Sequence, residues 1–164
     1  MIFYLILIVI LVFLDQLIKY LIRINLTSDS FIEIIPNLIH LTYQENRGIS
    51  FSIFSDLPDF YRVSLLSGVS FIVVVGIFVY LYFSWEKLNP LDKLGFSLIL
   101  SGAIGNLIDR FFREQVTDYM YFHFYDKSFF VNNLADDLIS IGFVLLLFQS
   151  FFGKDKHEQQ EKIS

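Results

Sequence analysis

The sequence predicts a membrane α-helical fold with four transmembrane helices and a small β-sheet on the membrane surface. Three observations support this. The 164 residues are 55% hydrophobic and have a mean hydropathy of +0.59, whereas soluble domains are about 45–50% apolar. The apolar residues are concentrated in four long segments. Short strand-like runs and a turn signal lie between the first two segments, where a small sheet can form.

The four predicted spans cover about residues 1–22, 63–85, 91–110 and 133–153. A bilayer core of about 30 Å needs about 20 residues of helix. The second segment meets this length without a charged residue, and the others meet it when their charged ends are included. The first lacks a basic leading region and a cleavage site, so we expect it to be retained. We therefore expect a single domain over 1–153 and a polar, disordered tail over 154–164.

The two long connectors differ in character. In the first, residues 31–35 and 38–43 alternate as strands do, and Pro36-Asn37 between them is a turn signal, which places the sheet at about residues 30–56. The second connector, residues 111–132, is rich in Tyr and Phe. Tyr is favoured at the membrane–water interface, because its ring is apolar and its hydroxyl is polar. Both connectors are thus expected at the membrane surface.

Polar side chains interrupt the spans only near one membrane face. Consecutive spans alternate in direction, so the ends of spans one and three and the start of span four lie on the same side. The residues concerned are Asp15, Lys19, Asn106, Asp109, Arg110, Asn133, Asp136 and Asp137. Charges at this depth cost a few kcal/mol each, so they are normally paired or functional. For Asp15 and Lys19 alone, a plain i,i+4 ion pair is the simpler interpretation.

A cluster of carboxylates in a low-dielectric site suits several functions. Two close carboxylates share one proton, and such a pair can activate water and hydrolyse an amide. The same groups can carry protons in a transporter or channel, or serve only to hold a structural subunit together. The spacing does not choose between these functions. A transporter would also need carboxylates along its path, and the apolar segments 63–85 and 94–108 contain none.

Composition excludes other chemistry. With no cysteine, the chain has no disulfide, thiol nucleophile or Cys-ligated metal. The histidines are far apart, so no metal and no cofactor are expected, and His40 and His123 are expected to be structural. The net charge of −5 argues against nucleic acid as a partner.

Five motifs together resemble one family. They are Asp15-Gln16 with Lys19, Asn46-Arg47-Gly48, the run from Gly102 to Arg110, Val116-Thr117-Asp118-Tyr119, and Asn133-Leu134-Ala135-Asp136. In order and spacing they resemble lipoprotein signal peptidase (signal peptidase II), a bacterial membrane aspartic peptidase. The resemblance covers essentially the whole chain and implies four transmembrane helices, an extracytoplasmic sheet and a short periplasmic or extracellular helix region.

The resemblance also implies a substrate and roles for residues. The substrate would be a prolipoprotein whose cysteine carries diacylglycerol, cut just before that cysteine by a monomeric enzyme in contact with membrane lipid. Asp118 and Asp136 match the catalytic aspartates, and Asn46 and Arg110 match residues that hold the substrate backbone. The supporting positions are Asp15, Lys19, Gly105, Asn106, Asp109, Asn133 and Ala135.

Three expectations follow for particular features. Helix-end geometry favours Asp109 as a dyad member, whereas the resemblance replaces it with Asp118 and leaves Asp109 to pair with Lys or Arg. Asp137 either places a second charge against Asp136 or points away from it, about 100° round the helix, and the latter is favoured. The resemblance implies the bacterial cytoplasmic (inner) membrane, an extracytoplasmic site and cytoplasmic termini, although more Lys and Arg lie on the site face than opposite it.

Overall fold

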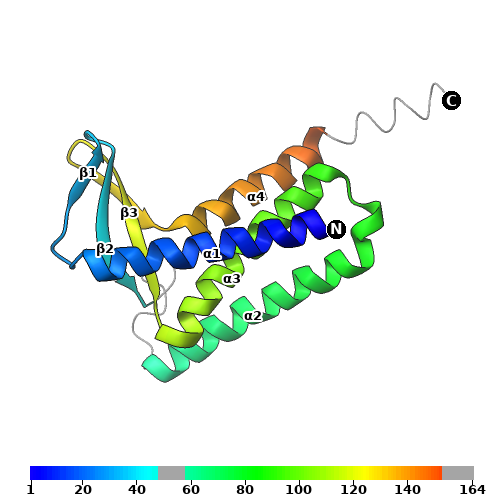
Figure 1. Cartoon of the computed structure of the whole chain (residues 1–164), viewed down its shortest axis with the longest axis horizontal. Helices are drawn as coiled ribbons and strands as arrows, with labels where there is room; N and C mark the ends of the chain where they lie inside the picture. Colours follow the sequence, from blue (N-terminus) through cyan, green and yellow to red (C-terminus); the bar gives the residue numbers. More distant parts are fainter. Residues whose placement is uncertain (48–57, 153–164) are drawn as a thin grey trace.

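The four predicted spans are present as helices. The computed structural model describes residues 1–47 and 58–152. Within them, four helices are long and apolar enough to cross a membrane: α1 (Ile2–Asn25), α2 (Asp59–Ser84), α3 (Pro90–Arg113) and α4 (Leu134–Phe152). They run side by side, with the N-terminus at the end away from the sheet (Figure 1). The expected tail, 154–164, lies outside the described residues.

Helix α3 occupies the centre of the bundle, because it contacts each of the other three helices. Its start follows from local sequence: the side chain of Asn89 accepts a hydrogen bond from the backbone N–H of Asp92 at 2.9 Å, and Pro90 stands at the first helical position. It ends at Glu114, which adopts a left-handed conformation with φ 62°. The central helix therefore ends two residues before β3 (Val116–Phe124), beside the sheet.

Small residues bring α3 and α4 close together. A Cβ atom added to Gly142 would lie 2.5 Å from the carbonyl oxygen of Gly95, and one added to Gly102 would collide with the carbonyl oxygen of Ala135. Glycine at such positions lets two membrane helices approach at backbone distance. On α2, by contrast, a Cβ added to Gly76 would meet nothing within 4 Å. The α3–α4 pair is thus the tightly packed part of the bundle.

A four-stranded antiparallel sheet stands at one end of the bundle, where α1 and α3 end and α4 begins (Figure 1). Its strands, in spatial order, are β1 (Ile32–Ile35), β2 (Ile39–Asn46), β3 (Val116–Phe124) and β4 (Lys127–Asn132). The sequence predicts β1 and β2, whereas β3 and β4 arise in the aromatic connector, of which only the stretch around His123 reads as extended. Residues 48–56 of the expected sheet lie outside the described part.

The expected short helix region is not seen among the described residues at the sheet end. The one short helix they contain, the 3-10 helix η2 (Trp85–Lys87), follows α2 at the opposite end of the bundle. Residues 48–57, which connect β2 to α2, lie outside the described residues.

His40 and His123 form part of a ring stack within the sheet. His40 and His123 are 8% and 7% exposed, and their ring centroids are 4.4 Å apart. Phe31 stacks on His40 at 4.1 Å, and Tyr121 stacks on His123 at 5.3 Å. The stack joins β2 and β3 to Phe31, the residue before β1, so both histidines are packed against other rings.

Candidate active site

Asp118 lies near the start of β3 and is 3% exposed. One carboxylate oxygen accepts a hydrogen bond from the side-chain nitrogen of Asn46 at 2.9 Å, and the other accepts from that of Asn133 at 2.6 Å. Burial, helped by the charge of Asp136, raises the pKa of Asp118 to about 6 against the opposing effect of the amide of Asn46. Asp118 therefore holds a proton at a higher pH than an ordinary aspartate.

Asp136 lies in the first turn of α4, one helical residue beyond the wholly buried Ala135. Its backbone N–H donates to the side-chain oxygen of Asn133 at 3.1 Å, which makes Asn133 the N-cap of the helix. The amide nitrogen of the same Asn133 donates to Asp118. One side chain thus ties the strand that holds Asp118 to the helix turn that holds Asp136.

Asn106 orients the carboxylate of Asp136. Its amide nitrogen donates to Asp136 Oδ1 at 2.7 Å, and its oxygen accepts from Lys19 Nζ at 2.9 Å. An ammonium group only donates hydrogen bonds, so Lys19 must face the oxygen of the amide. The nitrogen of Asn106 is therefore left to face Asp136.

Lys19 is fully buried together with two carboxylates. Its ammonium lies 2.9 Å from Asp15 and 3.0 Å from Asp109, and all three side chains are 0% exposed. The i,i+4 pair of Asp15 and Lys19 is present, but it is one part of a larger network. Arg23 and Arg113 add positive charge 3.8 Å from Asp109. Asp109 is thus paired with Lys and Arg side chains, as the resemblance implies, and it lies among the residues that support the dyad.

The first turn of α4 is bonded to the rest of the site through its backbone. The N–H of Ala135 donates to Asp15 at 3.1 Å, and the N–H of Leu134 donates to the hydroxyl of Tyr119 at 3.1 Å. A Cβ added to Gly105 would lie 2.5 Å from Asp15 Oδ2, so only glycine leaves room for that carboxylate. Burial raises the pKa of Tyr119 above its ordinary value, which keeps this hydroxyl neutral.

Arg110 approaches the two aspartates from α3. Its guanidinium donates to Ser70 on α2 at 3.3 Å, and its charge interacts with those of Asp136 and Asp118. Asn46, the other residue expected to hold the substrate, is bonded to Asp118. Asp137 is half-buried and accepts a hydrogen bond from Asn132 at 2.5 Å, so its carboxylate is directed to the end of β4.

The structure brings every expected site residue into one region. It adds contacts of Gln16, Arg23 and Thr117, to which the sequence gives no role. Gln16 donates to Asp15 at 3.1 Å and to the carbonyl of Gly105 at 3.0 Å. Arg23 donates to the hydroxyl of Thr117 at 3.0 Å. Position along the chain contained a signal for both donors: Gln16 adjoins Asp15, and Arg23 follows Lys19 by one helical turn. No group of three or more His, Asp or Glu side chains is placed to hold a metal ion in residues 1–47 and 58–152.

Taken together, fold and site define a multi-span membrane protein with a buried, asparagine-bridged aspartate pair at one end of its helix bundle. The family described as Signal peptidase (SPase) II matches residues 7–152. A lipoprotein signal peptidase from Fusobacterium nucleatum subsp. nucleatum is 34% identical over 151 residues, covering 91% of this chain and 86% of that protein.

Solved structures agree with the sequence comparisons. One bacterial membrane enzyme, determined at 1.9 Å resolution, has a TM-score of 0.79, 25% identity, and coverage of 91% of this chain and 92% of its own. Another, determined at 2.3 Å, has a TM-score of 0.74, 27% identity, and coverage of 90% and 87%. The chain belongs to the signal peptidase II family, a family of membrane aspartic peptidases.

Proposed function

We propose that this enzyme removes the signal peptide from prolipoproteins by cutting before the cysteine that carries diacylglycerol. The observation that carries the proposal is the bridge made by Asn133, which bonds Asp118 through its nitrogen and caps the turn of Asp136 through its oxygen. The bridge links two carboxylates whose surroundings differ, as a water-activating pair requires. The family membership supports the substrate class.

The dyad carries one proton between its two members. The raised pKa of Asp118, about 6, favours this side chain as the holder of the proton, and the amide of Asn106 orients the carboxylate of Asp136. Asp136 then takes a proton from water as the water oxygen attacks the scissile carbonyl carbon. Asp118 donates its proton toward the carbonyl oxygen. As the carbon–nitrogen bond breaks, the proton on Asp136 passes to the leaving amine and Asp118 takes back a proton from a hydroxyl of the tetrahedral intermediate, which restores the singly protonated pair.

Positive charge and amide groups around the dyad suit the bound peptide. Arg110, whose charge interacts with both aspartates, stabilises the negative charge that develops on the carbonyl oxygen. Asn46 binds the peptide backbone near the scissile bond, since it lies at the end of β2 beside Asp118. The diacylglycerol lies in the bilayer against the helices, whose outer faces expose large apolar side chains such as Phe13 and Phe71.

The test uses purified protein in detergent with synthetic prolipoprotein peptides that differ only in the diacylglyceryl group on cysteine. We expect cleavage of the lipidated peptide, with one product whose N-terminus is the lipidated cysteine by mass spectrometry, and no cleavage of the unlipidated peptide. Equal cleavage of both peptides, or a cut at another bond, would overturn the substrate assignment.

We also propose that the site lies on the extracytoplasmic side of the bacterial inner membrane, with both termini in the cytoplasm, and that 1–153 acts as a single monomeric domain. Because the chain has no cysteine, single cysteines report topology cleanly. Asp126→Cys in the turn between β3 and β4 should react with an impermeant maleimide on intact spheroplasts, and Glu86→Cys in η2 should react only after lysis. The reverse pattern would place the site in the cytoplasm.

A further inference from the structure

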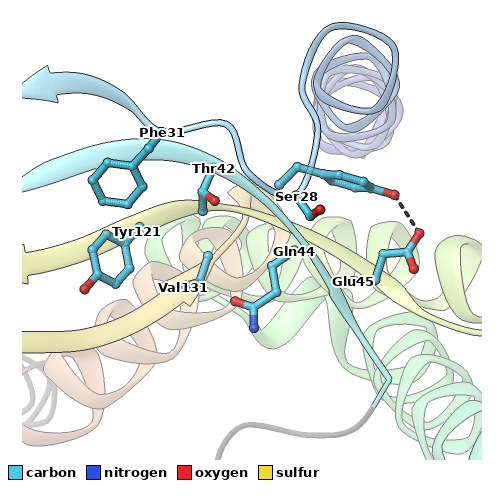
Figure 2. Close-up of a pocket in the computed structure, with 8 residues that line it drawn as sticks. Ser28, Phe31, Thr42, Gln44, Glu45, Tyr121 and Val131 are labelled. Carbon is cyan, nitrogen blue, oxygen red and sulfur yellow. Dashed lines mark hydrogen bonds between the residues drawn. The ribbon is translucent and has the colours of Figure 1, made fainter.

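A pocket on the sheet contains none of the dyad residues. Its volume is about 600 Å³, and it is lined by Ser28, Phe31, Thr42, Tyr43, Gln44, Glu45, Tyr121 and Val131. Figure 2 shows its labelled side chains along β2, β3 and β4 and the short segment that follows α1. Tyr121 follows Asp118 by three residues on β3, so their side chains point to opposite faces of the strand. The part of the pocket formed by Tyr121 therefore faces away from Asp118.

The pocket nevertheless begins close to the dyad. Gln44 is the cross-strand partner of Asp118, and Glu45 directly precedes Asn46, which is bonded to Asp118. Two residues of a strand span about 7 Å. A peptide bound at the dyad is thus within a few residues of the pocket.

The lining has two chemically different parts. Phe31 and Tyr121, with ring centroids 5.5 Å apart, form an apolar wall with Val131. At the other part, the side-chain amide of Gln44 offers a donor and an acceptor, which match a peptide group. The carboxylate of Glu45 accepts a hydrogen bond from the hydroxyl of Tyr43 at 2.6 Å and is exposed. No Lys or Arg is among the lining residues.

Only one part of the proposed substrate enters this region. In the proposed reaction the signal peptide and the diacylglycerol occupy the bilayer beside the helices, so the segment after the lipidated cysteine extends toward the sheet, which stands at one end of the bundle (Figure 1). We propose that the pocket binds this segment of the substrate, with an apolar side chain against Phe31 and Tyr121 and a cationic side chain against Glu45. This inference rests on the proposed function, and it adds a specificity site beyond the dyad.

The experiment compares two diacylated substrates with the same signal peptide. The short one ends about two residues after the cysteine, and the long one continues for about ten, with either Lys or Glu in the added segment. For the parent enzyme we expect kcat/KM to be higher for the long Lys substrate than for the short one. We expect the Lys substrate to be preferred over the Glu substrate by about threefold to tenfold, the range of one hydrogen bond or ion pair.

Variants locate the effect. Glu45→Gln keeps an acceptor for Tyr43 but removes the charge, so the preference for Lys over Glu should disappear, and Gln44→Ala should lower the long-to-short ratio. Asp126→Asn, an exposed carboxylate of the sheet outside the pocket, should retain both ratios. Equal kcat/KM for long and short substrates in the parent, or an unchanged Lys preference in Glu45→Gln, would overturn the pocket assignment while leaving the peptidase assignment intact. Failure of the parent to cleave the short substrate would instead overturn the proposed function.

Discussion

Lys19 donates a hydrogen bond to the side-chain oxygen of Asn106 at 2.9 Å, and this contact decides which end of the amide faces the dyad. Lys19 is itself held by Asp15 and Asp109 at 2.9 and 3.0 Å. The ion-pair network therefore does more than neutralise buried charge, because it presents an N–H group to Asp136. The first prediction concerns this network.

Lys19→Met should strongly destabilise the protein, because it leaves two carboxylates at 0% exposure without their common partner. Breaking a buried pair on one side costs about 3–5 kcal/mol. Thermal unfolding in detergent, followed by circular dichroism, should show a large fall in Tm. Lys127→Met, which removes an exposed lysine from β4, is the matched control and should leave Tm nearly unchanged. Similar Tm values for the two variants would contradict the network.

Asn133 has two roles that substitutions can separate. Asn133→Ala removes both the helix cap and the bond to Asp118, and the lost cap costs about 0.5–2 kcal/mol. Asn133→Ser retains a capping oxygen but is too short to donate to Asp118 as the asparagine does. We expect both variants to lose most peptidase activity and only the alanine variant to lose stability. A fully active serine variant would show that the bridge to Asp118 is not needed.

The α3–α4 contact should be sensitive to a single methyl group. Gly102→Ala would force the added Cβ against the carbonyl oxygen of Ala135, so α3 and α4 must separate and Tm should fall. Gly76→Ala on α2 meets nothing within 4 Å and replaces glycine with a better helix former, so it should be neutral or slightly stabilising, by up to about 1 kcal/mol. Equal effects at the two positions would contradict the described packing.

The pKa of Asp118 should respond in opposite directions to two neighbours. The charge of Asp136 raises it and the amide of Asn46 lowers it. In protein with ¹³C-labelled aspartate carboxyl groups, Asp136→Asn should therefore move the pKa of Asp118 below about 6, and Asn46→Ala should move it above. Because the proposed mechanism needs the dyad proton, kcat/KM of the free enzyme should fall as the pH rises through about 6. Shifts of the same sign in both variants would exclude this arrangement.

The spans and the polar layer could be predicted because they depend on simple rules. Span length follows from bilayer thickness, and alternation of direction places Asp15, Asn106 and Asp136 on one side. The stretch around His123 reads as extended, but β3 and β4 were not predicted as strands of the sheet, because a run of aromatic residues at a membrane surface also suits an interfacial loop. Composition does not show that this segment pairs with β2, for instance through the register of Gln44 with Asp118.

Long-range contacts set the finer features of the site. Helix-end geometry favours Asp109 as a dyad member, and only the resemblance replaced it with Asp118. The structure gives the physical contrast: Asp109 is surrounded by Lys19, Arg23 and Arg113, whereas Asp118 is bonded to neutral amides. The bridging geometry of Asn133 depends on a strand and a helix meeting, and no local pattern in the sequence predicts it.

The most direct measurement is the single-turnover rate of cleavage of a diacylated prolipoprotein by the parent, Asp118→Asn and Asp136→Asn, with Asp126→Asn as the control. Asparagine keeps the size of each side chain but can neither hold nor release the dyad proton. We expect each of the two dyad variants to lose a factor of at least about 10² to 10⁴ in rate while retaining the parental circular dichroism spectrum. Parental rates in either dyad variant would contradict the assignment of Asp118 and Asp136 as the catalytic pair.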